Sequence, residues 1–278
     1  MISVRAALAK GAAQLQHLAT GRRDAELLAM YSLGCDRAWL LTHPETPLTS
    51  EQAVQYEQLL ARRAGNEPIQ YITGEQEFYG LKFCVTPDVL IPRPETEHIV
   101  EALLARVPHD APLRIADIGT GSGAIAVVLA HSLPHAQVTA LDVSSAALAV
   151  ARDNAERNNV ADRVRLVESD LLAAVAGETF DAIVSNPPYV AANESLEPQV
   201  RHFEPAGALF AGPTGLEIYC RLVPQAHAAL RADGWLLLEI GYGQRDAVAQ
   251  LLAGWKSLSF VNDLQGIPRV ACAQRSVA

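Results

Sequence analysis

The sequence has a shortage of positive charge and no long hydrophobic run. Its 278 residues include 22 Lys and Arg against 31 Asp and Glu, which gives a formal net charge of −9. A protein that binds nucleic acid mainly through phosphate charge favours a basic surface, so this balance argues against that class. The longest apolar run, residues 124–130, is far shorter than the ~20 residues of a membrane-spanning helix. We therefore expect no membrane segment and no direct nucleic-acid binding.

Cysteine is also scarce. The four cysteines, Cys35, Cys84, Cys220 and Cys272, are too scattered for a metal knuckle or a disulfide framework. We expect no metal site and reduced cysteines in the core. The first 19 residues lack the continuous apolar stretch of a signal peptide. These features favour a cytoplasmic protein.

The composition predicts a folded chain with two domains. Half of the residues are hydrophobic and 19% are charged, which is typical of a globular protein. The first 65 residues have helical periodicity, including a helix over residues 50–64 with Thr49 or Ser50 as its N-cap. Residues 68–71 and 78–85 resemble the arms of a β-hairpin across a turn at Gly74. We predict a helical N-terminal domain with this linking hairpin over residues 1–84.

The remaining residues, 85–278, alternate strands and helices from about Ile115 onward. Strands that are separated by helices of this length need right-handed crossovers, which produce a parallel sheet covered on both faces. The last two strands, at residues 258–262 and 269–273, are close enough in sequence to form an antiparallel edge pair. The pattern therefore predicts a doubly wound α/β domain.

A glycine-rich loop, Asp117-Ile-Gly119-Thr-Gly121-Ser-Gly123, follows the first strand and opens the next helix. Glycine allows a ligand to approach the backbone, and a helix N-terminus offers unpaired N–H groups. Asp142 ends the second strand, where a carboxylate can accept both hydroxyls of a ribose. The two features predict a nucleoside-containing cofactor, although glycine turns can also simply tighten strand–helix packing.

Carboxylates near the loop bear on the identity of this cofactor. Gly119, Gly121 and Ala124 also satisfy the spacing of a dinucleotide fold. Asp117 would repel a pyrophosphate and suits the cationic amino-acid portion of S-adenosylmethionine, unless it only caps the loop. Asp170, which ends the third strand, can accept from an adenine amino group or be an ordinary loop carboxylate. These residues favour S-adenosylmethionine over a dinucleotide.

The fourth strand ends directly in Asn186-Pro187-Pro188-Tyr189. Ligands of open α/β sheets lie beyond the carboxyl ends of the strands, so this tetrapeptide and the glycine loop would face one crevice. A Pro-Pro pair can be a simple loop terminator, but its place beside a cofactor loop indicates a functional site. The Asn186 side-chain oxygen and the Pro187 carbonyl can each accept one N–H of an NH₂ group. These bonds strengthen as the nitrogen becomes cationic during methyl transfer, and Tyr189 can lie against the planar group.

With these motifs the chain resembles the class I S-adenosylmethionine-dependent methyltransferases, and specifically the bacterial protein-(glutamine-N5) methyltransferases that modify peptide chain release factors. The resemblance extends over essentially the whole chain. Its matching segments are residues 24–28, 68–74, 78–80, 91–97, 117–123, 185–189, 204–205, 208–209, 239–241, 263–264 and 269–270.

The resemblance implies a substrate, a cofactor and a fold. The substrate would be the glutamine of the Gly-Gly-Gln tripeptide of release factors, which are the implied protein partners. The cofactor would be S-adenosylmethionine, with S-adenosylhomocysteine as product. The fold would be a mostly parallel, seven-stranded Rossmann-like methyltransferase sheet with the small helical domain and its hairpin at the N-terminus.

The resemblance also implies the residues of the site. Cofactor contacts would come from Gly119, Thr120, Gly121, Ser122, Gly123, Asp142, Asp170, Leu171 and Asn186. The glutamine amide would be held by Asn186, Pro187, Pro188 and Tyr189, of which Asn186, Pro187 and Tyr189 would be catalytic. Many relatives have an aromatic residue in place of Leu171, so the implied adenine contact here is apolar without ring stacking.

For residues 91–97 and for the N-terminal domain, the sequence leaves two interpretations open. Residues 91–97 either begin a helix or, by resemblance, lie near the crevice, where Arg93 could pair with a carboxylate. The N-terminal domain is interpreted as a recognition domain for release factors, with a stabilising lid as the alternative.

Three other functions compete with methylation of a protein glutamine. A nucleic-acid amine methyltransferase of the adenine N6 type uses a similar tetrapeptide on an exocyclic NH₂, and the acidic charge balance argues against it. A noncatalytic binder of a translation protein would not need the intact tetrapeptide. An NAD-dependent oxidoreductase is the weakest alternative.

Overall fold

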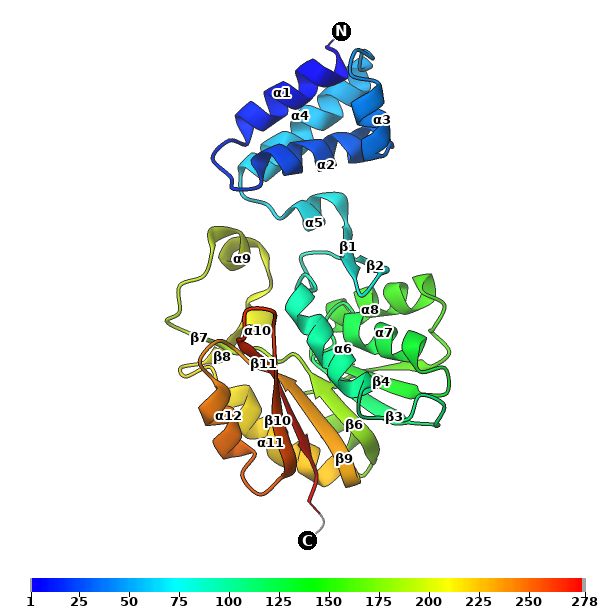
Figure 1. Ribbon diagram of the computed structural model, residues 1–278, viewed down its shortest axis with the longest axis vertical. Helices are drawn as coiled ribbons and strands as arrows, with labels where there is room; N and C mark the ends of the chain where they lie inside the picture. Colours follow the sequence, from blue (N-terminus) through cyan, green and yellow to red (C-terminus); the bar gives the residue numbers. More distant parts are fainter. Residues whose placement is uncertain (1, 277–278) are drawn as a thin grey trace. The chain divides into compact units, whose positions relative to one another are not determined.

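The structure is a computed structural model that describes residues 2–276, and its contacts divide the chain into two compact units (Figure 1). The smaller unit comprises the residues up to Gly74 together with residues 197–203, and the larger unit comprises residues 75–196 and those from Glu204 onward. Each unit has its own cluster of buried hydrophobic side chains. Each unit therefore has the core that a domain requires.

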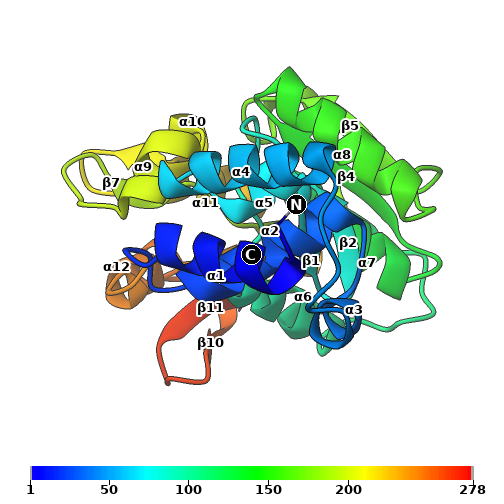
Figure 2. The same cartoon turned by 90° about the horizontal axis from the view of Figure 1, so that it is seen from above.

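The smaller unit is built from helices. Helices α1, α2 and α4 pack against one another around a core that includes Leu15, Leu28 and Leu60 (Figure 2). The helices of this unit are α1 Val4–Gln14, α2 Gly21–Leu33, α3 Arg37–Thr42, α4 Ser50–Ala64, α5 Ile69–Thr73 and α9 Pro198–Phe203. The side chains of Thr49 and Gln52 each accept from the other's backbone N–H, and this capping box confirms Thr49 as the N-cap of α4.

A buried ion pair joins α2 to α4. Arg63 Nε lies 2.8 Å from Asp24 Oδ2, and both side chains are almost fully buried. The Thr20 hydroxyl also donates to Asp24 Oδ2, and Arg63 Nη1 donates to the carbonyl of Glu67. Because buried charges require such partners, the network accounts for a charged residue, Asp24, on the inner face of α2.

The segment before the hairpin differs from the prediction. We predicted a strand over residues 68–71 and a hairpin turn at Gly74, but residues 69–73 form α5, and Gly74 ends it with a φ of 75°. The hairpin consists of β1 Glu75–Phe78 and β2 Leu81–Cys84, which pair antiparallel across Tyr79 and Gly80. Tyr71, from the predicted strand, and the next residue, Ile72, instead form the buried face of one helical turn.

The start of the chain is helical, as predicted. Its second helix, α2, begins at Gly21, and the short helix α3 follows it. A Cβ at Gly21 would lie 2.0 Å from the Leu15 carbonyl oxygen, so this position requires glycine. The close approach of two backbones explains this glycine.

The larger unit contains the predicted seven-stranded, mostly parallel sheet. Its strand order is β10-β11-β9-β6-β3-β4-β5. The strands are β3 Arg114–Ile118, β4 Gln137–Asp142, β5 Val164–Glu168, β6 Phe180–Ser185, β9 Leu230–Glu239, β10 Lys256–Asn262 and β11 Pro268–Gln274. β10 and β11 pair antiparallel, which confirms the predicted C-terminal pair, and β11 also pairs antiparallel with β9. A separate parallel pair joins β7 Val190–Ala191 and β8 Phe210–Gly212.

Helices cover both faces of this sheet (Figure 1). One buried cluster contains side chains of α6 Glu97–Leu104, α7 Ala124–Ser132 and α8 Ser145–Arg157, and the other contains side chains of α11 Glu217–Ala229 and α12 Arg245–Leu251. The remaining helical segments are η1 Pro94–Thr96, η2 Ala173–Val175 and α10 Ala206–Leu209. Residues 124–130 of α7 are all buried, which explains the longest apolar run of the sequence.

The strand order reverses between β3 and β6, which are neighbours at the centre of the sheet. The chain leaves β3 toward β4 and β5 and returns to β6 on the other side. β3 ends just before the glycine loop, and β6 ends just before Asn186. The Ser185 hydroxyl donates to the carbonyl oxygen of Ile118 at 2.7 Å and ties the two strand ends together. Both motifs therefore lie at the position where open α/β sheets bind ligands.

The β1–β2 hairpin groups with the larger unit, whereas we predicted it within an N-terminal domain ending at residue 84. Phe78 and Phe83 are fully buried in the core of the larger unit. Asn154 of α8 adds a polar anchor, since its amide accepts from Cys84 N at 2.6 Å and donates to the carbonyl oxygens of Cys84 and Ser122, both at 2.9 Å. One side chain thus fixes both the hairpin and the glycine loop to α8.

Replacing this asparagine tests its anchoring role. Asn154→Ala leaves three backbone groups without their partner, so we expect a loss of about 3 kcal/mol in the free energy of unfolding. Urea unfolding measures this change. The exposed neighbour Asp153 is a matched control on the same helix, and Asp153→Ala is expected to change stability by less than about 0.5 kcal/mol. Equal stabilities for the two variants would contradict the anchoring role.

The cysteines are more exposed than predicted. Only Cys272 is buried, Cys35 and Cys84 are half-buried and Cys220 is exposed, and all four are free. No helix in residues 2–276 is long and apolar enough to cross a membrane. The same residues contain no group of three or more His, Cys, Asp or Glu side chains that could hold a metal ion.

Candidate functional site

A cavity of about 390 Å³ lies at the carboxyl ends of β3, β4, β5 and β6 in the larger unit. Its volume falls within the range of about 300–1,000 Å³ that is typical of small-molecule sites. Of the residues predicted for the cofactor, eight line it: Gly119, Thr120, Gly121, Ser122, Asp142, Asp170, Leu171 and Asn186. Pro187 and Pro188 also line it, so the glycine loop and the start of the tetrapeptide share one cavity.

The glycines of the loop have two different roles. Gly119 and Gly121 have φ values of 70° and 54°, and a Cβ at either would meet no atom within 4 Å. Both therefore combine a turn that favours glycine with free space at the cavity wall. Gly123 does not line the cavity, and a Cβ there would lie 3.0 Å from the Ala151 side chain. The structure thus gives Gly123 a packing role between α7 and α8.

Asp142 braces the glycine loop from the end of β4. Its Oδ2 accepts from Gly121 N and its Oδ1 accepts from Ser144 N, both at 2.9 Å. The side chain is half-buried and lines the cavity, so lone pairs of both oxygens remain for a ligand. The carboxylate can therefore hold the loop and accept from two hydroxyls.

Asp117 is fully buried and does not line the cavity. Its Oδ2 accepts from the Thr120 hydroxyl at 2.6 Å and from Ala126 N at 3.2 Å, which corresponds to the loop-capping alternative. Burial raises the pKa of this carboxyl group to about 7, while these hydrogen bonds oppose the shift. Oδ1 is buried without a hydrogen-bond partner among residues 2–276.

Asp170 and Leu171 form the rim at the end of β5. Asp170 is exposed, and its Oδ2 lies 2.5 Å from Nη2 of Arg221. Leu171 is half-buried against the core, with a φ of 53°. A positive φ is unusual for a leucine and directs this chain segment around the cavity mouth.

Asn186 is oriented by a residue from another segment. Its Nδ2 donates to Oγ1 of Thr96 at 3.0 Å, and Thr96 is buried at the end of η1. This bond uses the amide nitrogen of Asn186, so its side-chain oxygen is the atom available to accept from a ligand. The predicted segment 91–97 therefore contributes to the site through Thr96.

Tyr189 lies in a different place from the rest of the tetrapeptide. It does not line the cavity, and its ring packs against the core. Its carbonyl oxygen accepts from Nε2 of Gln244 at 2.9 Å, while Oε1 of Gln244 accepts from Gly241 N at 3.0 Å. Burial raises the pKa of the Tyr189 phenol well above its usual value, which keeps it protonated at neutral pH.

An ion pair fixes one wall of the cavity. Arg93 Nη2 pairs with Oε1 of the buried Glu204, and the other oxygen of Glu204 accepts from Ile91 N at 3.3 Å. The predicted carboxylate partner of Arg93 is therefore Glu204. Because Pro205 and Pro92 both line the cavity, the pair joins two of its wall segments.

Glu239 and Gln244, which sequence reasoning did not assign to the site, lie near Tyr189 and do not line the cavity. Glu239 is buried at the end of β9, and the side chains of Thr96 and Tyr189 lower the pKa of its carboxyl group. Burial nevertheless raises its pKa to about 7. A carboxylate at the end of a buried strand was the available signal, but its partners are far away in the sequence.

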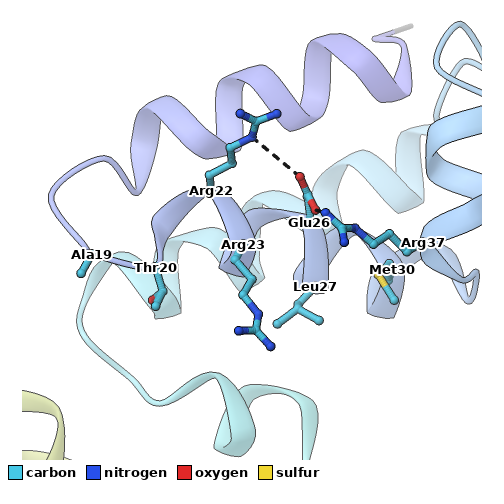
Figure 3. A pocket seen from close by; sticks show the side chains of 8 residues that line it. All are labelled: Ala19, Thr20, Arg22, Arg23, Glu26, Leu27, Met30 and Arg37. Atoms are coloured by element: carbon cyan, nitrogen blue, oxygen red, sulfur yellow. Dashed lines mark ion pairs between the residues drawn. The ribbon is translucent and has the colours of Figure 1, made fainter.

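The smaller unit has a separate hollow between α2 and α3, shown in Figure 3. It is lined by Arg22, Arg23 and Arg37, among others, and Glu26 pairs with Arg22 at 3.8 Å and with Arg37 at 3.2 Å. It has neither a glycine loop nor an amide group among its lining residues, so the chemistry of the tetrapeptide belongs to the cavity of the larger unit.

Comparisons with known proteins agree with both units. Residues 6–74 match the family model described as the PrmC N-terminal domain, and residues 95–208 match the Methyltransferase small domain. A 16S rRNA N2 G1207 methyltransferase from T. thermophilus, solved in complex with AdoMet and guanosine, shares the fold with a TM-score of 0.54 and 19% identity, covering 72% of this chain and 49% of that one.

Relatives that share most of the chain are more informative. The chain is 48% identical to a release factor glutamine methyltransferase of Koribacter versatilis, with 91% of each chain covered. It is 40% identical to a release factor glutamine methyltransferase of Escherichia coli, with 95% of each chain covered. At this identity and coverage, the chain belongs to the release factor glutamine methyltransferase family.

Proposed function

We propose that this protein transfers a methyl group from S-adenosylmethionine to the side-chain amide nitrogen of the glutamine in the Gly-Gly-Gln motif of peptide chain release factors. The observation that carries this proposal is that the glycine loop and the side chain of Asn186 line one cavity, with the Asn186 amide nitrogen already bonded to Thr96. A cofactor site and an acceptor for an NH₂ group are thereby adjacent.

The cavity fits a cationic nucleoside cofactor. Its lining residues include no Lys or Arg and two carboxylates, Asp142 and Asp170, of which only Asp170 is paired with an arginine, Arg221. A pyrophosphate would lack a cationic partner there, whereas a sulfonium and an amino group are favoured by negative charge. Asp142 is available for the ribose hydroxyls, the backbone at Gly119 and Gly121 allows close approach, and Leu171 offers an apolar contact to adenine. When bound, S-adenosylmethionine supplies an electrophilic methyl group on its sulfonium sulfur.

The tetrapeptide supplies the groups that an amide nucleophile needs. The Asn186 oxygen and the Pro187 carbonyl accept the two hydrogens of the glutamine NH₂ group and aim its nitrogen. Because the nitrogen becomes positive as it is alkylated, these acceptors bind the transition state more tightly than the ground state. The N-alkylated amide is acidic enough to lose a proton to water or to a carbonyl group.

The distribution of charge favours a protein substrate over a nucleic acid. Residues 1–74 contain seven basic and seven acidic residues, so the whole net charge of −9 belongs to residues 75–278, which carry the tetrapeptide. The phosphate groups of a DNA duplex or a tRNA would be repelled by the negative charge of this unit. An assay in which release factor, unmethylated plasmid and tRNA compete for labelled methyl groups tests this choice. Label on a nucleic acid in place of the release factor would overturn it.

The smaller unit is proposed to recognise the release factor outside the tripeptide. A flexible glycine-rich target gives few contacts, so a second contact region would raise selectivity. Each unit has its own buried core, which permits removal of residues 1–74. We expect this deletion to lower kcat/KM for whole release factor at least about tenfold more than for a short Gly-Gly-Gln peptide, by the loss of the second contact. Equal losses on both substrates would favour the lid alternative.

A further inference from the structure

Two exposed hydrophobic side chains of the larger unit, Tyr242 and Leu264, take no part in the proposed transfer. Tyr242 is 82% exposed and Leu264 is fully exposed, which makes them the two most exposed large hydrophobic side chains of residues 2–276. Single exposed hydrophobic residues are common on protein surfaces, so exposure alone identifies no site. What distinguishes these two is their place in the fold.

Both side chains lie at the end of the sheet that carries the tetrapeptide. β9 runs parallel to β6, so the segment that follows β9 and holds Tyr242 lies at the same end of the sheet as Asn186. β11 runs antiparallel to β9, so the turn of residues 263–267, which connects β10 to β11 and holds Leu264, is also at this end. Ligands of open α/β sheets bind there.

Tyr242 follows a backbone segment that packs against the tetrapeptide. A Cβ at Gly241, its neighbour in the chain, would lie 2.9 Å from Cδ2 of Tyr189. Nε2 of Gln244 donates to the Tyr189 carbonyl oxygen at 2.9 Å, while its Oε1 accepts from Gly241 N at 3.0 Å. The exposed Tyr242 side chain therefore begins one residue away from a contact with the tetrapeptide.

The turn that holds Leu264 is well braced. Oδ1 of Asp263 accepts from Gln265 N at 2.8 Å and from Ile267 N at 3.0 Å. Oδ2 of the same carboxylate accepts from Nε of Arg269 at 2.9 Å. Because the turn is held by these bonds, a partner that binds Leu264 does not have to order the backbone around it, which lowers the entropic cost of binding.

The two segments are joined to each other and have the same chemistry. Ile240 N donates to the carbonyl oxygen of Arg269 at 2.8 Å and links the end of β9 to the base of the turn. Residues 240–244 and 263–267 contain no Lys or Arg, and Arg269 is already paired with Asp263. A nucleic acid would find no free cation on these segments, whereas the apolar side chains of a protein can cover a leucine and a tyrosine.

We propose that Tyr242 and Leu264 form an apolar docking surface for the segments of a release factor that flank its Gly-Gly-Gln tripeptide. The inference rests on the proposed function, which brings the target glutamine to the tetrapeptide. Since that glutamine enters the cavity from solvent, its neighbours in the release factor chain remain outside, at the end of the sheet where these two side chains are exposed. The surface adds contacts that the glycines of the tripeptide cannot make.

Binding of release factor without turnover is the first test. Calorimetry with intact release factor and S-adenosylhomocysteine should give a Kd about tenfold higher for Leu264→Gln than for the wild type, and about tenfold higher for Tyr242→Gln, as for residues that carry much of an interface. The double variant should bind more weakly than either single variant. Wild-type Kd values for both single variants would contradict the proposal.

Leu258 provides the matched control, because it is an exposed leucine of the same hairpin, near the start of β10 and away from the turn. Leu258→Gln should keep the wild-type Kd. Leu264→Met, which retains an apolar side chain of similar volume, should also bind like the wild type. Equal weakening by Leu258→Gln and Leu264→Gln, or by Leu264→Met and Leu264→Gln, would overturn the proposal.

Methylation kinetics separate docking from a general loss of structure or from a role in the cavity. In Leu264→Gln and Tyr242→Gln, kcat/KM for intact release factor should fall by about the same factor as the affinity, while a Gly-Gly-Gln tripeptide, which lacks the flanking segments, should be methylated as by the wild type. The melting temperature should stay close to that of the wild type, because both side chains are exposed. An equal loss on the tripeptide would contradict docking.

The remaining outcomes distinguish this inference from the proposed function. If the wild type binds release factor but does not methylate it, the proposed function is wrong, while the Kd values still test the surface. If the wild type methylates release factor and both variants bind it normally, only the docking surface is wrong. A wild-type dimer that Leu264→Gln converts to a monomer, measured by light scattering, would assign the surface to a second copy of the chain and overturn the proposal.

Discussion

Asn186→Ala is expected to lower kcat for release factor methylation by about 10²–10³-fold, the loss typical of removing one group that stabilises developing charge. The side chain reaches the cavity from the end of β6, and its nitrogen is held by Thr96 at 3.0 Å. Alanine removes the only side-chain acceptor of the tetrapeptide that lines this cavity, so the target nitrogen loses both alignment and charge stabilisation. Single-turnover transfer of labelled methyl groups measures the effect.

A control asparagine lies in the loop that follows. Asn193 is exposed, and Asn193→Ala should retain wild-type kcat. The melting temperature of Asn186→Ala should remain close to that of the wild type, because Asn186 is only half-buried and alanine removes a single side-chain hydrogen bond. If Asn186→Ala is folded and keeps the wild-type kcat, the side chain of Asn186 does not take part in methyl transfer.

Asp142→Ala is expected to weaken S-adenosylmethionine binding by about 10- to 100-fold, as for lost hydrogen bonds to a charged group. Its two oxygens accept from Gly121 N and Ser144 N, each at 2.9 Å, so alanine removes both the ribose acceptor and the brace of the glycine loop. Asp142→Asn should also bind weakly, because its NH₂ group would face one of these two N–H donors. Isothermal titration calorimetry measures both dissociation constants.

A second aspartate provides the control for the loss of S-adenosylmethionine affinity in Asp142→Ala. Asp162 is exposed and outside the cavity, so Asp162→Ala should bind S-adenosylmethionine like the wild type. Equal affinities for Asp142→Ala and the wild type would show that the end of β4 does not hold the cofactor. The observed loop geometry would then serve packing alone.

The parallel sheet could be predicted because its information is local. Each strand is a short apolar segment next to a helix, and the crossover rule then leaves few topologies. The position of Asn186 and of the glycine loop at neighbouring strand ends follows from that topology. Gly123 shows the limit, since its contact with Ala151 on α8 is a tertiary feature that the spacing of the glycine loop does not reveal.

The errors and omissions share a different origin. Residues 69–73 contain residue types that favour strands, but burial of Tyr71 and Ile72 on one face of a helical turn outweighs that preference. The Arg93–Glu204 pair joins residues 111 apart in the sequence, and Thr96 meets Asn186 across 90 positions. Such contacts leave no local pattern, so the residues that orient the tetrapeptide become visible only in the folded structure.

The most direct measurement is the position of the methyl group on a release factor incubated with this protein and S-adenosylmethionine. Tandem mass spectrometry of the Gly-Gly-Gln peptide should place one methyl group on the glutamine side-chain nitrogen, and the Asn186→Ala variant should leave the peptide unmodified under the same conditions. An unmodified glutamine with the active wild-type protein, or a methyl group at another residue, would contradict the proposed function.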